Sequence, residues 1–101
     1  MSNEKAFLNL LGLATRARKI SLGEEQILKD IKRKQAKLVL IASDTGYQTH
    51  KRLTDKCTFY NIPYRIVTDR LTLSAAIGKA DRVAIAVNDE GFAKKMCTLL
   101  D

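Results

Sequence analysis

The stretch Lys19 to Lys37 reads K-I-S-L-G-E-E-Q-I-L-K-D-I-K-R-K-Q-A-K, and the spacing of its apolar residues changes in the middle. Ile20 and Leu22 alternate with polar residues, as in a half-buried strand, whereas apolar residues recur at helical spacing within residues 27–31. The change falls at Gly23, and glycine adopts backbone angles that are closed to other residues. The stretch therefore predicts a strand, a glycine turn and an amphipathic helix whose start can face a polar ligand.

Apolar periodicity along the rest of the chain predicts alternating helices and strands. After a first helix that ends near Leu13, strands are predicted at residues 20–22, 38–42, 64–67 and 82–87, and helices start near residues 24, 47, 73 and 90. Such alternation places helices on both faces of a mainly parallel sheet. We expect one domain over residues 1–101, an α/β protein forming a three-layer α/β/α sandwich with a four-stranded mixed sheet. The pattern does not identify the antiparallel strand.

The loops that follow parallel strands gather along one edge of a sheet, where ligands of open α/β sheets bind. Four segments are candidates for this edge, namely Gly23 with Glu24, Ser43–Gly46, Thr68–Leu71 and Asn88. We expect the glycine turn and the loop after the third strand to lie side by side as one cationic slot.

Two pairs in the glycine turn also have purely structural explanations. Ser21 and Glu24 have the spacing of a capping box, which would satisfy the helix start without a ligand. Glu25 and Lys29 have the spacing of a helical ion pair.

The charge of the chain indicates a polyanionic partner. Eighteen Lys and Arg residues oppose eleven Asp and Glu residues among 101, which gives a formal net charge of +7. Such an excess raises affinity for nucleic acid in a salt-dependent way, although it can also serve solubility alone. No apolar run approaches the roughly 20 residues that span a bilayer, so we expect a cytoplasmic protein without a membrane partner.

The residues needed for a metal or cofactor site are missing from the sequence. Cys57 and Cys97 are far apart and are expected to be buried reduced thiols, and His50 is the only histidine. These three residues lack the spacing of a zinc site. Neither G-x-x-x-x-G-K nor G-x-G-x-x-G occurs, so we expect no metal, no cofactor and no nucleotide site.

Asp44-Thr45-Gly46 follows an apolar strand, as the catalytic tripeptide of aspartic proteases does. Two such aspartates meeting across a dimer could share a proton and perform acid–base chemistry. Those proteases consist almost entirely of strands and are rich in glycine, whereas this chain has five helix-periodic segments and five glycines. The rest of the sequence therefore argues against a protease and, more generally, against an enzyme.

The stretch G-E-E-Q-I-L-K-D-I-K-R at Gly23–Arg33 resembles the G-x-N-E-x-x-K-x-x-x-R signature of the kink-turn RNA-binding ribosomal protein superfamily, with its L-seven-Ae, L-thirty-e, S-twelve-e and Gadd-forty-five types. Three later segments resemble it too: A-K-L-V-L-I-A-S-D at Ala36–Asp44, N-I-P-Y at Asn61–Tyr64 and V-T-D-R-L-T-L-S-A-A-I-G at Val67–Gly78. The resemblance covers nearly the whole chain in order, and the small size is most similar to bacterial YlxQ-type members. It implies a non-catalytic, monomeric RNA-binding protein.

The resemblance also implies roles for individual residues. By resemblance, the start of the second predicted helix would approach the sheared G·A pairs of a kink-turn, and Val67 with its neighbours would meet an extruded base. Phosphate contact by Arg16 and Lys19 is expected from their charge, although a solvated connector explains these two residues equally well. The residues implied in RNA binding are Arg16, Lys19, Gly23, Glu24, Glu25, Gln26, Lys29, Arg33, Lys34, Val67, Thr68, Asp69, Arg70 and Leu71. The partner would be ribosomal RNA or a structured messenger RNA, and the ribosome is a further candidate.

Three positions depart from the family pattern. Glu25-Gln26 replaces Asn-Glu, and Lys34 replaces the glycine usual after the helix. A carboxylate accepts two hydrogen bonds from a guanine edge, whereas an amide both accepts and donates, so Gln26→Glu is expected to tighten kink-turn recognition. The alternative is a protein-interaction adapter of the same fold that has lost specific RNA readout.

Overall fold

The structure is a computed structural model, and it describes residues 3–101. Within this range the helices are α1 (Glu4–Arg16), α2 (Glu24–Lys32), α3 (Tyr47–Tyr60), α4 (Arg70–Ala76) and α5 (Glu90–Leu100), and the strands are β1 (Ile20–Leu22), β2 (Leu38–Ile41), β3 (Tyr64–Ile66) and β4 (Ala84–Val87). Helices and strands alternate along the chain, which confirms the predicted order.

The sheet is mixed, with strand order β1-β4-β2-β3. β2 and β3 pair in parallel, with Val39 opposite Tyr64, whereas β4 pairs antiparallel with both β1 and β2. The antiparallel strand that the sequence left open is therefore β4. A helix rises about 1.5 Å per residue, so the seven residues of α4 span only about 10 Å. The chain therefore enters β4 at the same edge of the sheet at which it left β3, and β4 runs in the opposite direction.

The direction of β4 corrects the prediction for Asn88. This residue follows the carboxyl end of an antiparallel strand, so it lies at the opposite edge from Gly23. There its backbone amide donates to the carbonyl of Lys19 at 2.8 Å. It does not share the edge at which the other three candidate segments lie.

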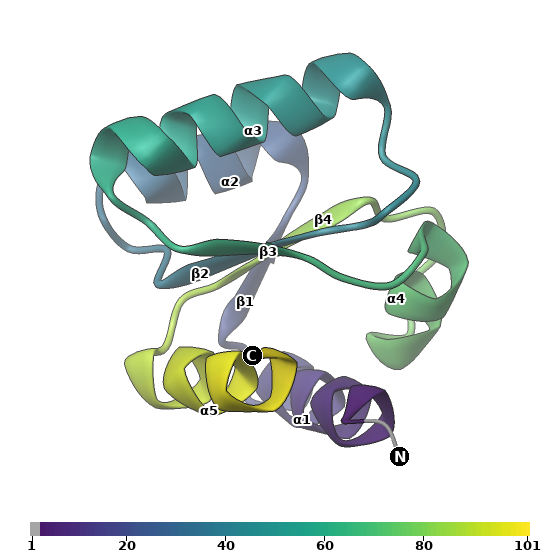
Figure 1. The fold of residues 1–101 in the computed structure, drawn as a ribbon. Helices are drawn as coiled ribbons and strands as arrows, with labels where there is room; N and C mark the ends of the chain where they lie inside the picture. Colours follow the sequence, from purple (N-terminus) through teal and green to yellow (C-terminus); the bar gives the residue numbers. More distant parts are fainter. Residues whose placement is uncertain (1–2) are drawn as a thin grey trace.

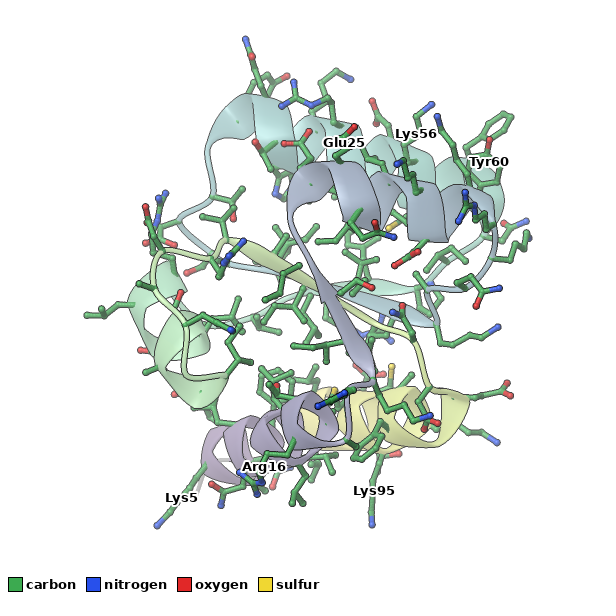
Figure 2. All side chains as sticks on the ribbon, turned by 180° about the vertical axis from the view of Figure 1, so that it is seen from behind. Lys5, Arg16, Glu25, Lys56, Tyr60 and Lys95 are labelled. Atoms are coloured by element: carbon green, nitrogen blue, oxygen red, sulfur yellow. The ribbon has the colours of Figure 1, made fainter. Side chains whose placement is uncertain are left out.

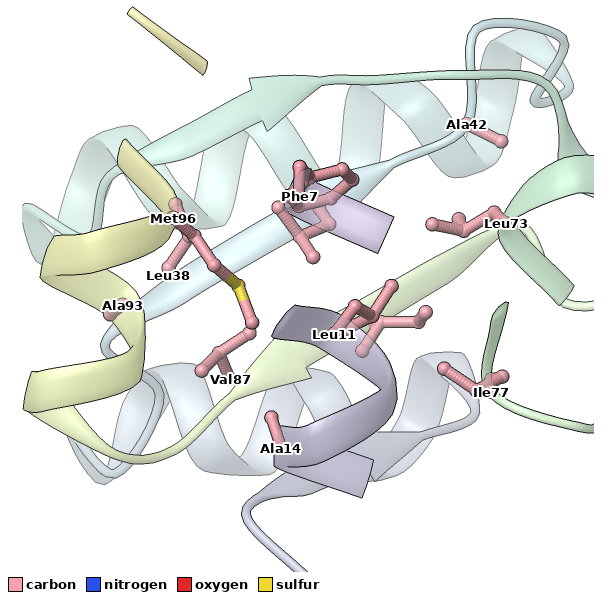
Figure 3. Packing of buried hydrophobic residues seen from close by; sticks show 12 residues of the cluster. Phe7, Leu11, Ala14, Leu38, Ala42, Leu73, Ile77, Val87, Ala93 and Met96 are labelled. Atoms are coloured by element: carbon pink, nitrogen blue, oxygen red, sulfur yellow. The ribbon is translucent and has the colours of Figure 1, made fainter. Parts of the chain in front are cut away.

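The two faces of the sheet are covered by different helix pairs. In Figure 1, α2 and α3 lie over one face, α1 and α5 lie over the other, and α4 stands beside the sheet. Figure 3 shows the core under α1 and α5, where Phe7 and Leu11 meet Met96 and the strand residue Val87. The second core, under α2 and α3, is formed by Ile27, Ile31, Val39, Ile41, Leu53, Cys57 and others.

Two helix boundaries differ from the predictions. α1 continues to Arg16, past the expected end near Leu13. α4 begins at Arg70, within the segment expected to be a loop, because the Asp69 side chain accepts from the Thr72 amide and caps the helix.

The two cysteines differ in burial, which corrects the expectation that both are buried. Cys57 lies in the second core, where burial raises the pKa of its thiol to about 12, whereas Cys97 is only half-buried. Both thiols are free. No helix within residues 3–101 combines the length and the apolar character needed to cross a bilayer.

Candidate RNA interface

One edge of the sheet collects most of the candidate segments. The carboxyl ends of β1, β2 and β3 and the amino end of β4 lie at this edge, which we call the loop edge. Gly23 follows β1, the Ser43–Gly46 turn follows β2, and residues 67–69 follow β3. Because β4 and β2 lie between β1 and β3, the glycine turn and the loop after β3 share an edge but are separated by two strands.

Gly23 begins α2 in a conformation that glycine favours. Its backbone angles are φ 86° and ψ 133°, and a Cβ built on it would have no atom within 4 Å. Glycine is thus needed here for its backbone angles, and its surroundings are open to a ligand.

The first turn of α2 presents unpaired donors. No side chain caps the helix, and Ile27 makes the first amide bond, to the carbonyl of Gly23 at 2.9 Å. Within residues 3–101, the amides of Glu24, Glu25 and Gln26 have no hydrogen-bond acceptor, as is usual at an uncapped helix start. The capping box expected from the spacing of Ser21 and Glu24 does not form.

Glu24 joins the start of α2 to α3. Its carboxylate pairs with the Arg52 guanidinium and accepts from Thr49 Oγ1 at 3.3 Å. The hydrogen bond from Arg52 lowers the pKa of Glu24, and burial opposes this only in part. The Glu24 side chain therefore has a structural partner that RNA would have to displace.

The middle of the loop edge is held by Arg70. Its side chain donates to the Asp44 carbonyl at 2.8 Å, its amide donates to Asp44 Oδ1 at 2.9 Å, and its guanidinium lies 3.7 Å from Asp81. The Asp69 carboxylate also has a partner within the protein. It accepts hydrogen bonds from Thr72, and these bonds lower its pKa. The expected slot is therefore a balanced edge in which carboxylates and cations are paired, rather than a uniformly positive one.

A cleft of about 180 Å³ lies on the loop edge beside the glycine turn. It is lined by Gly23, Glu24, Thr49, Asp81, Arg82, Val83 and Ala84. Arg82 was missed as a site residue because the sequence assigned it to a strand. Only the antiparallel placement of β4 brings it next to Gly23, and no local sequence signal marks that neighbour.

The outer surface of α2 carries cations. Glu25, Gln26, Lys29 and Arg33 are all exposed, and Figure 2 shows Glu25 on the outside of the first turn. Among residues 3–101, no salt bridge joins Glu25 to Lys29, and none involves Arg33. Lys29 and Arg33 are one turn apart, so they form a basic stripe that continues from the glycine turn.

Three of the implied phosphate contacts lie elsewhere. Arg16 is on α1, across the sheet from α2, as Figure 2 shows. Lys19 precedes β1 at the edge opposite Gly23. Lys34 lines a cleft of about 380 Å³ at that opposite edge, together with Lys37 and Lys94. A single binding face that contains the loop edge therefore does not contain Arg16, Lys19 or Lys34.

The loop after β3 places its apolar residues in different settings. Val67 is half-buried against the core under α1 and α5, and its amide donates to the Ile41 carbonyl at 2.9 Å. Thr68 accepts from the Ser43 amide at 3.0 Å through its carbonyl. Leu71, in the first turn of α4, is 79% exposed and is the freer apolar surface for an unstacked base.

Sequence comparisons show the family. The family model described as Ribosomal protein L7Ae/L30e/S12e/Gadd45 family matches residues 5–97. The chain is 50% identical to the RNA-binding protein YlxQ of Bacillus subtilis (strain 168), over 91% of this chain and 92% of that protein. It is 31% identical to the large ribosomal subunit protein eL8 of Thermoplasma volcanium, over 83% of this chain and 70% of that protein.

Solved structures show the same fold. A protein with unknown function from Bacillus halodurans C superposes with a TM-score of 0.91 at 48% identity, covering 94% of this chain and 96% of that one. The Giardia lamblia 15.5kD RNA binding protein superposes with a TM-score of 0.80 at 22% identity, covering 92% of this chain and 83% of that one. Together with the family match, these results establish that the chain belongs to the Ribosomal protein L7Ae/L30e/S12e/Gadd45 family.

Proposed function

We propose that the protein binds folded RNA of the kink-turn type through the loop edge and the outer surface of α2. The observation that carries the proposal is the open start of α2, where three unpaired amides follow a glycine with no neighbour over its Cβ position. Backbone amides at a helix start hold anions and base edges at close range. The relative YlxQ is named an RNA-binding protein, and so is the Giardia protein that has the same fold, which supports the proposal.

Phosphate contacts would come from three cations that form no salt bridge within the described residues 3–101. Lys29 and Arg33 on α2 are exposed, and Arg82 lies in the cleft beside Gly23. Glu24, Asp69 and Arg70 would instead shape the edge, because their charges are used within the protein. Leu71 would meet an unstacked base, since RNA is read chiefly at such nucleotides.

A gel-shift titration tests this interface. Kink-turn RNA, a scrambled RNA and duplex DNA are titrated at two salt concentrations with the wild type, Lys29→Ala and Arg33→Ala. Each substitution is expected to weaken binding and to flatten the salt slope by about one unit.

Lys95→Ala on α5 is the matched control. It also removes one exposed positive charge, but from the helix pair on the other face of the sheet. Equal losses for all three variants would mean that net charge alone drives binding, and unchanged binding by Lys29→Ala and Arg33→Ala would remove the proposed face.

A protein-interaction adapter is the second candidate, and one surface favours it. A groove of about 330 Å³ on α2 and α3 is lined by Leu28, Arg52, Asp55, Lys56 and Phe59. Phe59 is 76% exposed, which is unusual for a large apolar side chain. If the wild-type protein bound no RNA in the titration above, the adapter function would be favoured.

We further propose that the protein acts in the cytoplasm as a monomer without catalytic activity. The relatives are named as RNA-binding and ribosomal proteins, which supports a binding role. Asp44, the aspartate of the protease-like tripeptide, is engaged by Arg70 and stabilises the loop edge instead.

A further inference from the structure

A buried carboxylate lies near the carboxyl end of α2, one helical turn after Gln26. Asp30 is 6% exposed, and its Oδ2 accepts a hydrogen bond from Ser21 Oγ of β1 at 2.5 Å. Its Oδ1 accepts from Gln26 Nε2 at 3.0 Å, one helical turn earlier. Ser21 Oγ in turn accepts from Asn88 Nδ2 at 2.6 Å. These contacts join the Gln26 side chain to β1 and to the residue that follows β4.

The partner determines which way the Gln26 amide faces. An aspartate carboxylate offers only acceptors, whereas a glutamine amide has a donor end and an acceptor end. The donor end must therefore face Asp30. The amide oxygen is the end that Asp30 does not engage. It makes no hydrogen bond within residues 3–101, and Gln26 as a whole is exposed.

We propose that Asp30 is a positioning residue that fixes the Gln26 amide so that its oxygen faces a guanine of the bound RNA. This inference rests on the proposed function. Guanine has N–H donors on its Watson–Crick edge, so a fixed oxygen accepts from it, whereas a freely turning amide would present its NH2 group equally well. Asp30 thus gives a neutral glutamine the acceptor character of the family's glutamate without adding a charge near RNA phosphates.

The same contact reverses the expected effect of Gln26→Glu. The introduced glutamate would bring a second carboxylate next to Asp30, and like charges at that distance repel. The glutamate side chain would turn away from the position that Gln26 occupies. We therefore expect weaker kink-turn recognition, about tenfold, in place of the tighter recognition that the sequence suggested.

Two single substitutions and their combination test the inference by titration with kink-turn RNA and with duplex RNA of equal length. In Asp30→Asn, the new amide accepts from Ser21 and turns its NH2 group toward Gln26, which must reverse its own amide. We expect about tenfold weaker binding of the kink-turn and no change for the duplex. In the double variant Asp30→Asn with Gln26→Glu, that NH2 group donates to the glutamate, and kink-turn affinity returns to within about threefold of wild type.

Matched controls separate this contact from charge. Asp55→Asn and Gln35→Glu make the same chemical changes at exposed positions. The Gln35 backbone amide bonds to the Asp30 carbonyl, but no hydrogen bond within residues 3–101 joins either side chain to the Gln26–Asp30 side-chain pair, so both variants should leave the kink-turn preference unchanged. Absence of rescue in the double variant would overturn the inference, as would wild-type binding by Asp30→Asn in a protein that prefers the kink-turn. A wild type that binds both RNAs equally would overturn the proposed function itself.

A measurement on the unmodified protein keeps the inference testable if Asp30→Asn does not fold. The side-chain amide protons of Gln26 should exchange with water more slowly than those of the exposed Gln35, as NMR can detect. Equal exchange rates would show that Asp30 does not hold the Gln26 amide.

Discussion

At the scale of a single residue, Gly23 sets the start of α2 through its backbone angles alone. A side chain at φ 86° and ψ 133° is strained, although no atom would contact its Cβ. We predict that Gly23→Ala lowers the free energy of unfolding by about 1–3 kcal/mol, the usual cost of such a conformation. Urea denaturation followed by circular dichroism measures this change.

Gly46→Ala is the control for that prediction. Gly46 also begins a helix and also has open space around its Cβ position, but its φ of −59° suits any residue. The control should leave stability unchanged or raise it slightly, because alanine restricts the unfolded chain. Equal destabilisation by both substitutions would mean that positive φ is not the reason for glycine at position 23.

At the scale of elements, Glu24 ties the start of α2 to α3 through Arg52. Its pKa is lowered from 4.5 in the folded protein, so the ion pair stabilises the fold above the unfolded-state pKa. This stabilisation disappears as the pH falls through the lower folded-state pKa. We predict that Glu24→Gln costs at most about 1 kcal/mol at pH 7, as expected for a partly exposed pair, and progressively less as the pH falls through the lowered folded-state pKa.

Thermal unfolding of the two proteins across this pH range measures the difference. Asp55→Asn is the matched control, because the Lys51–Asp55 pair lies within α3 and joins no second element. It should cost only a few tenths of a kcal/mol. A Glu24→Gln penalty that persists at low pH would show that packing, rather than charge, carries the contact.

At the scale of the whole molecule, two cores share one four-stranded sheet. Leu11 lies in the core under α1 and α5, Leu53 lies in the core under α2 and α3, and both side chains are fully buried. We predict that Leu11→Ala and Leu53→Ala each lower the free energy of unfolding by about 2–5 kcal/mol. Each variant should still unfold in a single transition, because loss of either layer exposes the sheet on which the other layer depends.

NMR signals of Phe7 and Tyr60 can follow the two cores separately. Phe7 reports on the core under α1 and α5, and Tyr60 reports on the core under α2 and α3. Coincident loss of both signals supports one cooperative domain over the chain. Survival of one layer after the other unfolds would divide the chain into two folding units.

Local spacing was sufficient to predict most of the elements. The change of period at Gly23 correctly predicted β1 and α2, and Asn61, with φ 60°, ends α3 as a residue tolerant of the left-handed conformation should. The start of α4 was predicted too late. Asp69 caps the helix, but it stands among polar residues that are also typical of a loop.

The site was less predictable, because it depends on which strands become neighbours. The sequence by itself determined the alternation of elements, the glycine turn and the basic stripe of Lys29 and Arg33, since each depends on residues a few positions apart. Only the tertiary structure decided the direction of β4, which placed Arg82 beside Gly23, moved Asn88 to the other edge and brought Asn88 onto Ser21, the partner of Asp30. Pairing between distant segments and the satisfaction of a buried carboxylate are properties of the packed chain, and no local pattern of residues specifies them.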